Sequence, residues 1–434
     1  MIAVLTLLLE FVVLAIIKGS GVLVISNVLA TVLIMLFSVS FVAAVQNSKI
    51  LYKYTSAIII GYLLRLFLLY FDLYGNGIYV LPNSGQDADM FYRQATSLIL
   101  TGVPNRETNF ALLLIAVFQR IGANRLYGQF LLMLLSEVAI LMTIHTIDTL
   151  SVPNESKSRV AVLLNVLPNF AILSSIFLRE SLVTVLITIS ACCMVKWMKG
   201  GNAALFVCAI VSSIFACLYH SGSIGITIGC IMCLLIYDRH ERRIHLTGSG
   251  MILAIVFAIA ASFVFLRYGD RLMGKFGNVD SLEDIANTRD AAGSSYVRYV
   301  GNSNNPIDML IFTIPRIVYF LFSPFPWQWR GPSDLIAFFF SGLYYIVVIK
   351  HLISYLRNEH DDGNRGIVIG LTMLAFLTTF IFAWGVSNTG TAARHRDKMV
   401  CLYGIIYALT YLPNTQEQLS KSEDVVKQES LYIR

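Results

Sequence analysis

Long apolar runs separated by short polar connections account for most of the chain. A stretch of roughly 20 apolar residues is long enough to cross a bilayer as a helix. Two shorter apolar pieces, 108–121 and 307–323, stand between the long runs. We therefore expect an all-α, polytopic transmembrane helix bundle. About twelve spans are predicted, near 2–17, 21–45, 55–73, 127–148, 160–178, 181–197, 203–219, 222–237, 247–266, 334–350, 366–386 and 398–412.

Basic residues in the connections predict how these spans are oriented. Lys and Arg are concentrated in QNSKILYKY, ESKSR, KWMKGG, DRHERR and KHLISYLRNEHDDGNR. Cytoplasmic connections of membrane proteins carry such an excess. All five connections fall on one face if neither short piece crosses the membrane. We therefore expect both termini in the cytoplasm, and both short pieces as helices in the outer interface.

This topology predicts one transmembrane domain over residues 1–412 and no separate soluble domain. The outer face would carry a long loop at 74–126 with two interfacial helices, a second region at 267–333 and a few short turns. Residues 413–434 form a polar segment that we expect to be a flexible cytoplasmic tail. Any chemistry would then take place at the membrane, on the outer face.

Composition supports a membrane protein and narrows its partners. The 434 residues are 56% hydrophobic and only 13% charged, which is more apolar surface than a soluble domain of this size can bury. The net charge of +6 is modest. A lipid bilayer is therefore an expected partner, and nucleic acid is not. Cys230 and Cys233 form a CxxC pattern inside a predicted span, where packing is the expected role.

Two acidic residues begin an amphipathic helical pattern in the stretch NSGQDADMFYRQATSLI. One interpretation is structural: Asp87 caps the helix and Asp89 complements its dipole. The other is functional, because neighbouring carboxylates raise each other's proton affinity, which suits a general base. One would act as base or substrate anchor, while the other would hold a sugar hydroxyl or a metal. The spacing is compatible with both interpretations.

The first outer loop resembles that of the GT-C class of membrane glycosyltransferases. The likeness rests on the long loop, its two expected interfacial helices and the Asp-x-x-Tyr motif from Asp89 to Tyr92. The chain departs from the class because more than one span precedes the loop and because its carboxylates, in Asp-Ala-Asp, are not adjacent. The resemblance implies a polyprenyl-(pyro)phosphate-linked sugar donor and a glycan acceptor at a bacterial plasma membrane. It also implies that Asp87 or Asp89 is the catalytic base, with Tyr92 beside the sugar.

Arg179 and Glu180 interrupt the apolar stretch NFAILSSIFLRESLVTVLITIS. Charges near the end of a span are tolerated when they are paired or face water. The pair can be a hairpin turn that reaches the interface, or it can point into an outer cavity, with Arg179 on phosphate and Glu180 in catalysis. The pair at this turn resembles one associated with bacterial polysaccharide membrane enzymes. His220, at equivalent depth, either caps a turn or contacts sugar.

Tryptophan and arginine gather in the stretch RIVYFLFSPFPWQWRGP. Tryptophans at the interface commonly anchor a membrane protein, and their flat faces also suit sugar rings. Trp327 and Arg330 are therefore candidates for sugar binding as well as for anchoring. The run from Pro324 to Trp327 resembles a motif of membrane proteins from polysaccharide gene clusters.

A basic, Gly/Thr-rich segment lies directly ahead of the last predicted span. Interpreted as a turn, it places cations at a helix N-terminus, where each costs about 0.3–1 kcal/mol, and on the face that positive charge avoids. A bound anion reverses both costs, since the helix N-terminus, backbone donors near Gly390 and guanidinium groups together suit phosphate. The alternative is neutralisation by Asp397 and lipid headgroups. The predicted phosphate ligands are Arg394, His395, Arg396 and Lys398.

These patterns favour an integral membrane glycosyltransferase of cell-surface polysaccharide assembly. One alternative is an oligosaccharide repeat-unit polymerase, which needs a base less because pyrophosphate is a good leaving group. Another is a polysaccharide transporter or flippase. Transporters place ionisable groups near mid-membrane, and Arg65 is the main such residue here. No cofactor is required by these patterns, and a divalent metal is an open alternative.

Overall fold

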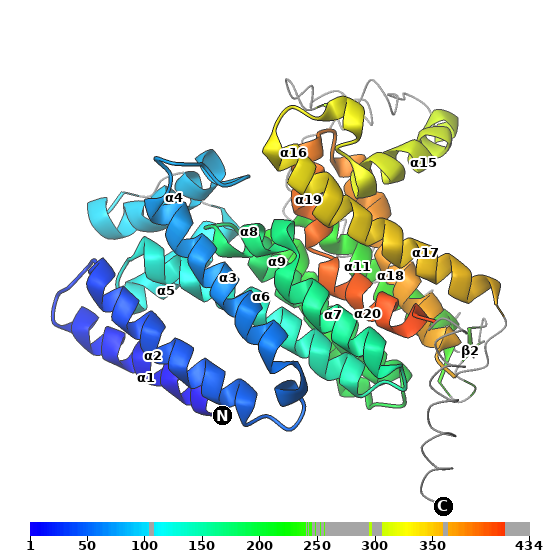
Figure 1. The fold of residues 1–434 in the computed structure, drawn as a ribbon, viewed down its shortest axis with the longest axis horizontal. Coiled ribbons are helices and arrows are strands. Elements are labelled where there is room, and N and C mark those ends of the chain that lie inside the picture. Colours follow the sequence, from blue (N-terminus) through cyan, green and yellow to red (C-terminus); the bar gives the residue numbers. More distant parts are fainter. Residues whose placement is uncertain are drawn as a thin grey trace, which may run out of the picture.

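The computed structural model is an α-helical bundle with one hairpin of two-residue strands (Figure 1). It describes residues 1–103, 108–239, 306–358 and 363–412, and also Glu241, Arg243, Ile244, Gly248, Ile252, Val256, Ser295 and Tyr296. The elements are α1 (Ile2–Gly19), α2 (Asn27–Gln46), η1 (Leu51–Tyr54), α3 (Thr55–Tyr74), α4 (Gln86–Thr101), α5 (Asn109–Ile121), α6 (Arg125–Asp148), α7 (Asn154–Val166), α8 (Pro168–Ser175), α9 (Glu180–Met198), α10 (Ala203–Tyr219), η2 (Ser221–Ser223), α11 (Ile224–Ile236), β1 (Tyr237–Asp238), β2 (Arg243–Ile244), α15 (Pro306–Phe322), η4 (Pro326–Gln328), α16 (Pro332–Ile336), η5 (Ala337–Gly342), α17 (Leu343–Arg357), α18 (Arg365–Gly385), α19 (Thr389–Asp397) and α20 (Val400–Thr410).

Membrane spans are fewer than the sequence predicted. Among the described residues, seven helices are long and apolar enough to cross a membrane, or eight if the bent pair α7–α8 is one span. The predicted number of twelve is therefore not confirmed, because α10, α11 and α20 are shorter apolar helices. Most of the predicted span 247–266 and of the region 267–333, and the whole tail 413–434, lie outside the described residues.

Three of the five basic connections predicted to share a face lie near one another at the same end of the bundle. At this end, which we call the basic end, Lys53 and Lys157 both contact Asp148, and Lys199 Nζ donates to the Thr149 carbonyl at 2.8 Å. At the opposite end the backbone of Ala123 pairs with that of the α1–α2 connection. The grouping of these three connections agrees with the prediction, while the side of the membrane that each end faces stays a prediction.

The two short apolar pieces are both helices. The first corresponds to α5, which packs against α4 and α1, and the second to α15, which packs against α18 and α19. Their predicted position in the membrane interface stays a prediction.

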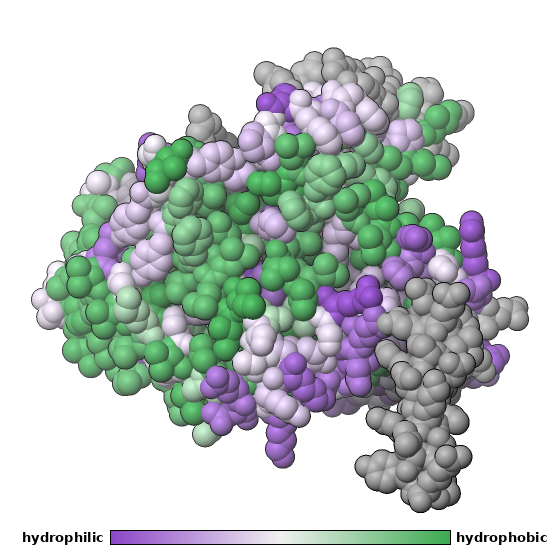
Figure 2. All heavy atoms as spheres, viewed as in Figure 1, coloured by the Kyte–Doolittle hydropathy of each residue, from purple (hydrophilic) through white to green (hydrophobic). Residues whose placement is uncertain are grey.

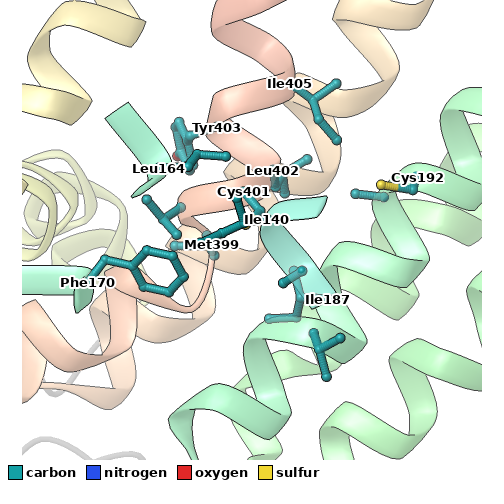
Figure 3. Packing of buried hydrophobic residues seen from close by; sticks show 14 of the residues in the cluster. Ile140, Leu164, Phe170, Ile187, Cys192, Met399, Cys401, Leu402, Tyr403 and Ile405 are labelled. Carbon is teal, nitrogen blue, oxygen red and sulfur yellow. The ribbon is translucent and has the colours of Figure 1, made fainter. Parts of the chain in front are cut away.

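The core of the bundle is built around α20. All eleven of its residues are buried, and it packs against α6, α7, α9, α17 and α18. Figure 3 places Cys401, Leu402 and Ile405 of α20 among side chains such as Ile140 and Ile187. The helix is about 16 Å long at 1.5 Å per residue, so it is too short to cross a bilayer by itself.

The outer helices expose apolar surface instead of burying it. On α1 the side chains of Leu5, Leu8, Leu9 and Ile16 are all more than half exposed. Figure 2 shows apolar residues covering much of this face of the molecule, with hydrophilic residues gathered toward the basic end. An apolar surface of this extent is what a lipid-facing bundle requires, because lipid is its solvent.

A break divides the span made of α7 and α8, with a bend of 49°. Pro168 has no N–H, so the Leu164 carbonyl loses the donor that a continuous helix would supply. Arg65, from α3, replaces it: its Nη2 donates to the Leu164 carbonyl at 2.8 Å and its Nη1 to the Asn165 carbonyl at 2.8 Å. Gly61 allows the close approach, since a Cβ there would lie 2.5 Å from Asn165.

Candidate functional site

Charged side chains from three parts of the chain meet at the end of the bundle opposite the basic end. Arg394 is at the centre, with Nη1 at 2.6 Å from Asp87 and Nη2 at 3.0 Å from Glu180. Lys398 Nζ lies 3.6 Å from the same Glu180 oxygen. Arg179 precedes Glu180 and adds its charge to the same field. We call these five residues the ion-pair cluster. It holds three cations and two carboxylates.

Helix ends deliver each member of the ion-pair cluster. Asp87 lies in the first turn of α4, whose N-cap is Gly85 at φ 122°, so Asp87 does not occupy the capping position. Glu180 begins α9 directly after the Arg179 turn. Arg394 lies in the last turn of α19. Because these charges meet at helix ends, none of them has to lie in the middle of a membrane span.

The basic segment before the last helix is itself helical, which corrects the expected turn. The side chain of Asn388 caps α19 by accepting from the Thr391 N–H at 2.7 Å. The helix therefore begins near Gly390, and Arg394 falls at its C-terminal end. Cations are stabilised there by the helix dipole instead of being repelled. The dipole argument for a bound anion is thus removed, and the case for an anion now depends on the side chains.

Arg394 and Arg396 point to different places, although the sequence grouped them. Residues two apart on a helix do not share a face. Arg396 is fully buried and donates to Ser341 Oγ at 2.7 Å. Its remaining bonds go to backbone carbonyls at the end of α15, in the residues that follow it and in η5, those of Phe320, Leu321, Ser323 and Ala337. Arg396 therefore anchors α19 and lies outside the ion-pair cluster.

Asp397 is also held inside the protein. It accepts hydrogen bonds from Asn169 Nδ2 at 2.5 Å and Ser341 Oγ at 2.7 Å. Burial raises the pKa of Asp397 to about 6, against the opposing effect of Arg396. The expected neutralisation of the basic segment by Asp397 therefore applies to Arg396, while Asp87 and Glu180 neutralise Arg394.

Burial weakens the charge of Lys398. It lowers the pKa of this ammonium group to about 7, and the charges of Arg179 and Arg394 act in the same direction, although Glu180 opposes them. For Arg394 burial also acts to lower the pKa, but Glu180 and Asp87 raise it more. The ion-pair cluster thus contains a guanidinium that stays charged and an amine poised near neutral pH.

Two imidazoles lie beside the ion-pair cluster. His220 Nε2 and His395 Nε2 are 2.8 Å apart, joining the α10–α11 turn to α19. Lys398 Nζ lies 3.5 Å from the other ring nitrogen of His395. Burial and the charge of Lys398 hold the pKa of His395 well below its ordinary value. One imidazole therefore donates to the other, and both predicted residues lie at the site.

Asp89 and Tyr92 form a second, adjacent group. Asp89 pairs with Arg125 Nη1 at 2.6 Å, so the two carboxylates of α4 have different arginine partners. Tyr92 is half-buried, with its ring 5.6 Å from that of Phe177 and 5.8 Å from the Arg125 guanidinium. The carboxylate pair expected from Asp-Ala-Asp therefore does not share one site. Arg125 was not among the predicted residues.

Trp327 and Arg330 have local partners. Trp327 is 60% exposed and stacks on Phe325 with ring centroids 4.8 Å apart. Arg330 pairs with Asp334 across one helical turn, at 3.6 Å. Both lie in the connection between α15 and α16, so the structure does not join them to the ion-pair cluster. Their sugar-binding role stays a prediction.

A small pocket opens beside Glu180 and Arg394. Hydroxyl side chains line much of it, namely Ser136, Ser174, Ser181 and Thr184. Within the described residues, Glu180 Oε2, Ser136 Oγ and Ser181 Oγ are buried without a hydrogen-bond partner. Buried polar atoms are normally paired, so this pocket suits a small polar group such as a sugar hydroxyl.

In the part of the chain that the structure describes, no three His, Cys, Asp or Glu side chains gather as metal ligands. Comparison of the chain with protein-family models, curated proteins and solved structures found no match.

Proposed function

We propose that this chain is an integral membrane glycosyltransferase that uses a polyprenyl-(pyro)phosphate-linked sugar in bacterial cell-surface polysaccharide assembly. The observation that carries the proposal is the composition of the ion-pair cluster: three cations against two carboxylates, at the end of an apolar bundle. Guanidinium groups recognise phosphate oxygens through paired N–H donors. Nε of Arg394 and Nε of Arg179 have no hydrogen-bond partner among the described residues, so both retain donors.

Asp87 is the member of the cluster that a phosphate would displace. Its side chain is 51% exposed, while Glu180 is buried. Exchange of Asp87 for phosphate on Arg394 keeps the guanidinium neutralised throughout. The freed carboxylate is then a base for the acceptor hydroxyl, whose oxygen attacks the anomeric carbon as the bond to the phosphate oxygen breaks. A single displacement of this kind inverts the anomeric carbon.

A repeat-unit polymerase is the second candidate, and one observation favours it. Asp87 and Asp89 are each bound to a different arginine, Arg394 and Arg125, so the two carboxylates do not form one shared site for a base. A pyrophosphate leaving group requires less help from a base. The main role of the ion-pair cluster would then be to bind the pyrophosphate leaving group.

Transfer assays with the purified protein in liposomes test both candidates. Monosaccharide-phosphate and oligosaccharide-pyrophosphate donors are compared, and product formation with only one of them selects between the candidates. Asp87→Asn should reduce transfer about a hundredfold if Asp87 is the base. Glu155→Gln, at the exposed Arg159 pair, is the matched control and should retain full activity.

Full activity of both Asp87→Asn and Asp89→Asn would remove the base assignment. Movement of lipid-linked sugar between leaflets, with no transfer from either donor, would replace the proposal by transport.

A further inference from the structure

An open groove lies between α15 and α17, away from the ion-pair cluster. It has a volume of about 660 Å³, within the range of about 300–1,000 Å³ typical of ligand sites. One wall is made by Val318, Phe322 and Phe325, from α15 and the residues that follow it. The other wall is a stripe of α17, and the gap between the two helices is visible at the right of Figure 2.

The α17 wall is mostly apolar, with a lysine halfway along the helix and polar residues at its C-terminal end. Ile346, Ile349 and Ile353 line the groove at helical spacing, and Ile353 is 45% exposed. Lys350 and Arg357 line the same wall, about 10 Å apart along the helix. The segment Pro332–Arg357 is long and apolar enough to cross a membrane, so the apolar part of the groove would face acyl chains.

Among the described residues, the charged side chains at the polar end of the groove are all positive. Its ten described lining residues include Lys350 and Arg357, and no carboxylate. Just beyond, the Arg365 guanidinium donates to the carbonyls of Leu356 and Asn358, which places a third cation near that end. Basic pockets between transmembrane helices bind anionic lipid headgroups. An apolar slot that ends in cations matches a molecule with an acyl tail and an anionic head.

We propose that this groove binds one anionic glycerophospholipid. Its phosphate contacts Lys350 and Arg357, and an acyl chain lies along Ile353, Ile349 and Ile346 toward Phe322. A zwitterionic lipid fits the apolar part equally well but does not neutralise the two cations. The proposal is independent of the proposed transferase activity, because the groove shares no lining residue with the ion-pair cluster.

Native mass spectrometry of the full-length protein in detergent tests this site. Phosphatidylglycerol and phosphatidylcholine with identical acyl chains are titrated separately, and the adducts that survive collisional activation are counted. We expect one retained phosphatidylglycerol and about tenfold weaker retention of phosphatidylcholine, as two charge contacts near a membrane surface would give.

The double variant Lys350→Gln/Arg357→Gln should lose that preference. Lys53→Gln/Lys199→Gln removes the same charge at the basic end and should keep it. Ile353→Trp fills the apolar part and should reduce retention of both lipids, and size-exclusion profiles check that each variant is folded. Equal retention of the two lipids by the native protein overturns the proposal. So does a preference that survives in the Lys350/Arg357 variant, or a protein dimer that takes the place of the lipid adduct.

Discussion

Two arginines with carboxylate partners, Arg65 and Arg394, occupy very different surroundings. Arg65 lies at the helix break, fully buried, 3.5 Å from Glu137 and bonded to three backbone carbonyls and Ser174 Oγ. Arg394 lies at the helix ends, 14% exposed, and its hydrogen bonds go to two carboxylate side chains. One guanidinium is bound mainly by backbone, and the other by two carboxylate side chains, of which Asp87 is exposed and Glu180 is buried.

The difference separates a structural arginine from one suited to exchange. Carbonyls of a helix break cannot leave, so any ligand at Arg65 would expose orphan acceptors to an apolar interior. Asp87 can swing into water, so an anion can take its place on Arg394 without leaving a buried charge unpaired. The partners of an arginine in a membrane protein therefore indicate its role better than its position along the bilayer normal does.

The largest expected effect is at Arg65. Arg65→Met leaves Glu137 buried without its cation and removes two donors from the α7–α8 break. Loss of one partner of a buried pair costs about 3–5 kcal/mol. We expect the purified variant to aggregate at much lower temperature than the native protein, as measured by thermal scans followed by size exclusion.

Glu137→Met in the same chain is the control for charge. The double variant should be more stable than Arg65→Met, because the unpaired carboxylate is gone. It should stay less stable than the native protein, because the Leu164 and Asn165 carbonyls still lack a donor. Native-like stability of Arg65→Met alone would contradict the structural role.

At Arg394 we expect a large functional effect with a small structural one. Arg394→Gln leaves Glu180 with Lys398, so stability should fall by only about 1–2 kcal/mol. Transfer should fall about a hundredfold or more, as when one preorganised donor to a developing anion is removed. Thermal scans and transfer rates on the same preparation measure both. A variant that loses stability and activity in proportion would make Arg394 a second structural arginine.

The pH dependence tests Lys398. Its pKa in the folded protein, about 7, lies below its ordinary value of 10.5. As pH rises through about 7 the cluster loses one positive charge, and binding of a donor phosphate should weaken roughly tenfold. The free energy of unfolding should instead rise with pH above pH 7, because the unfolded chain then holds more protons than the folded one.

Donor binding and thermal stability, followed from about pH 6 to about pH 9, measure the two trends. In the Lys398→Met variant, neither donor binding nor thermal stability should change with pH in this way. Binding that strengthens with pH in the native protein would exclude Lys398 as a phosphate contact.

The smallest expected effect is at Trp327. Trp327→Ala should raise the donor KM about threefold and leave kcat unchanged, since one exposed stacking contact contributes about 0.5–1.5 kcal/mol. Phe67→Ala, at an equally exposed aromatic on the lipid face of α3, controls for anchoring and should leave KM unchanged. Equal KM values in the two variants would mean that Trp327 only anchors.

Long apolar runs predicted most of the long helices well, because spans such as α2, α6 and α18 are unbroken. It failed at α19, where Gly390 and two threonines suggested a turn. The helix there is fixed by one cap, Asn388, and by the buried bonds of Arg396, which no local pattern reveals. Had 389–397 been assigned as helix, the two-residue spacing would have separated Arg394 from Arg396.

The sequence predicted the residues of the ion-pair cluster but not which of them pair with one another. Arg179 and Glu180 are predicted because they interrupt an apolar stretch, Asp87 because it belongs to an acidic pair at the start of an amphipathic helix, and Arg394 because it lies in a basic segment ahead of the last span. That Asp87 binds Arg394, 307 residues away, and not Asp89, follows only from tertiary packing. Arg125 was missed because a single arginine at the start of a long helix carries no distinguishing pattern.

The helix break has a consequence for how this chain can vary. Pro168 creates the unmet carbonyl at Leu164, and Arg65 meets it from another helix. Replacing Pro168 or Arg65 alone should be tolerated less well than replacing both. Without the proline, a backbone amide takes the carbonyl that the guanidinium binds. Without the arginine, that carbonyl faces hydrocarbon with no donor. In homologous chains, the two positions should therefore covary.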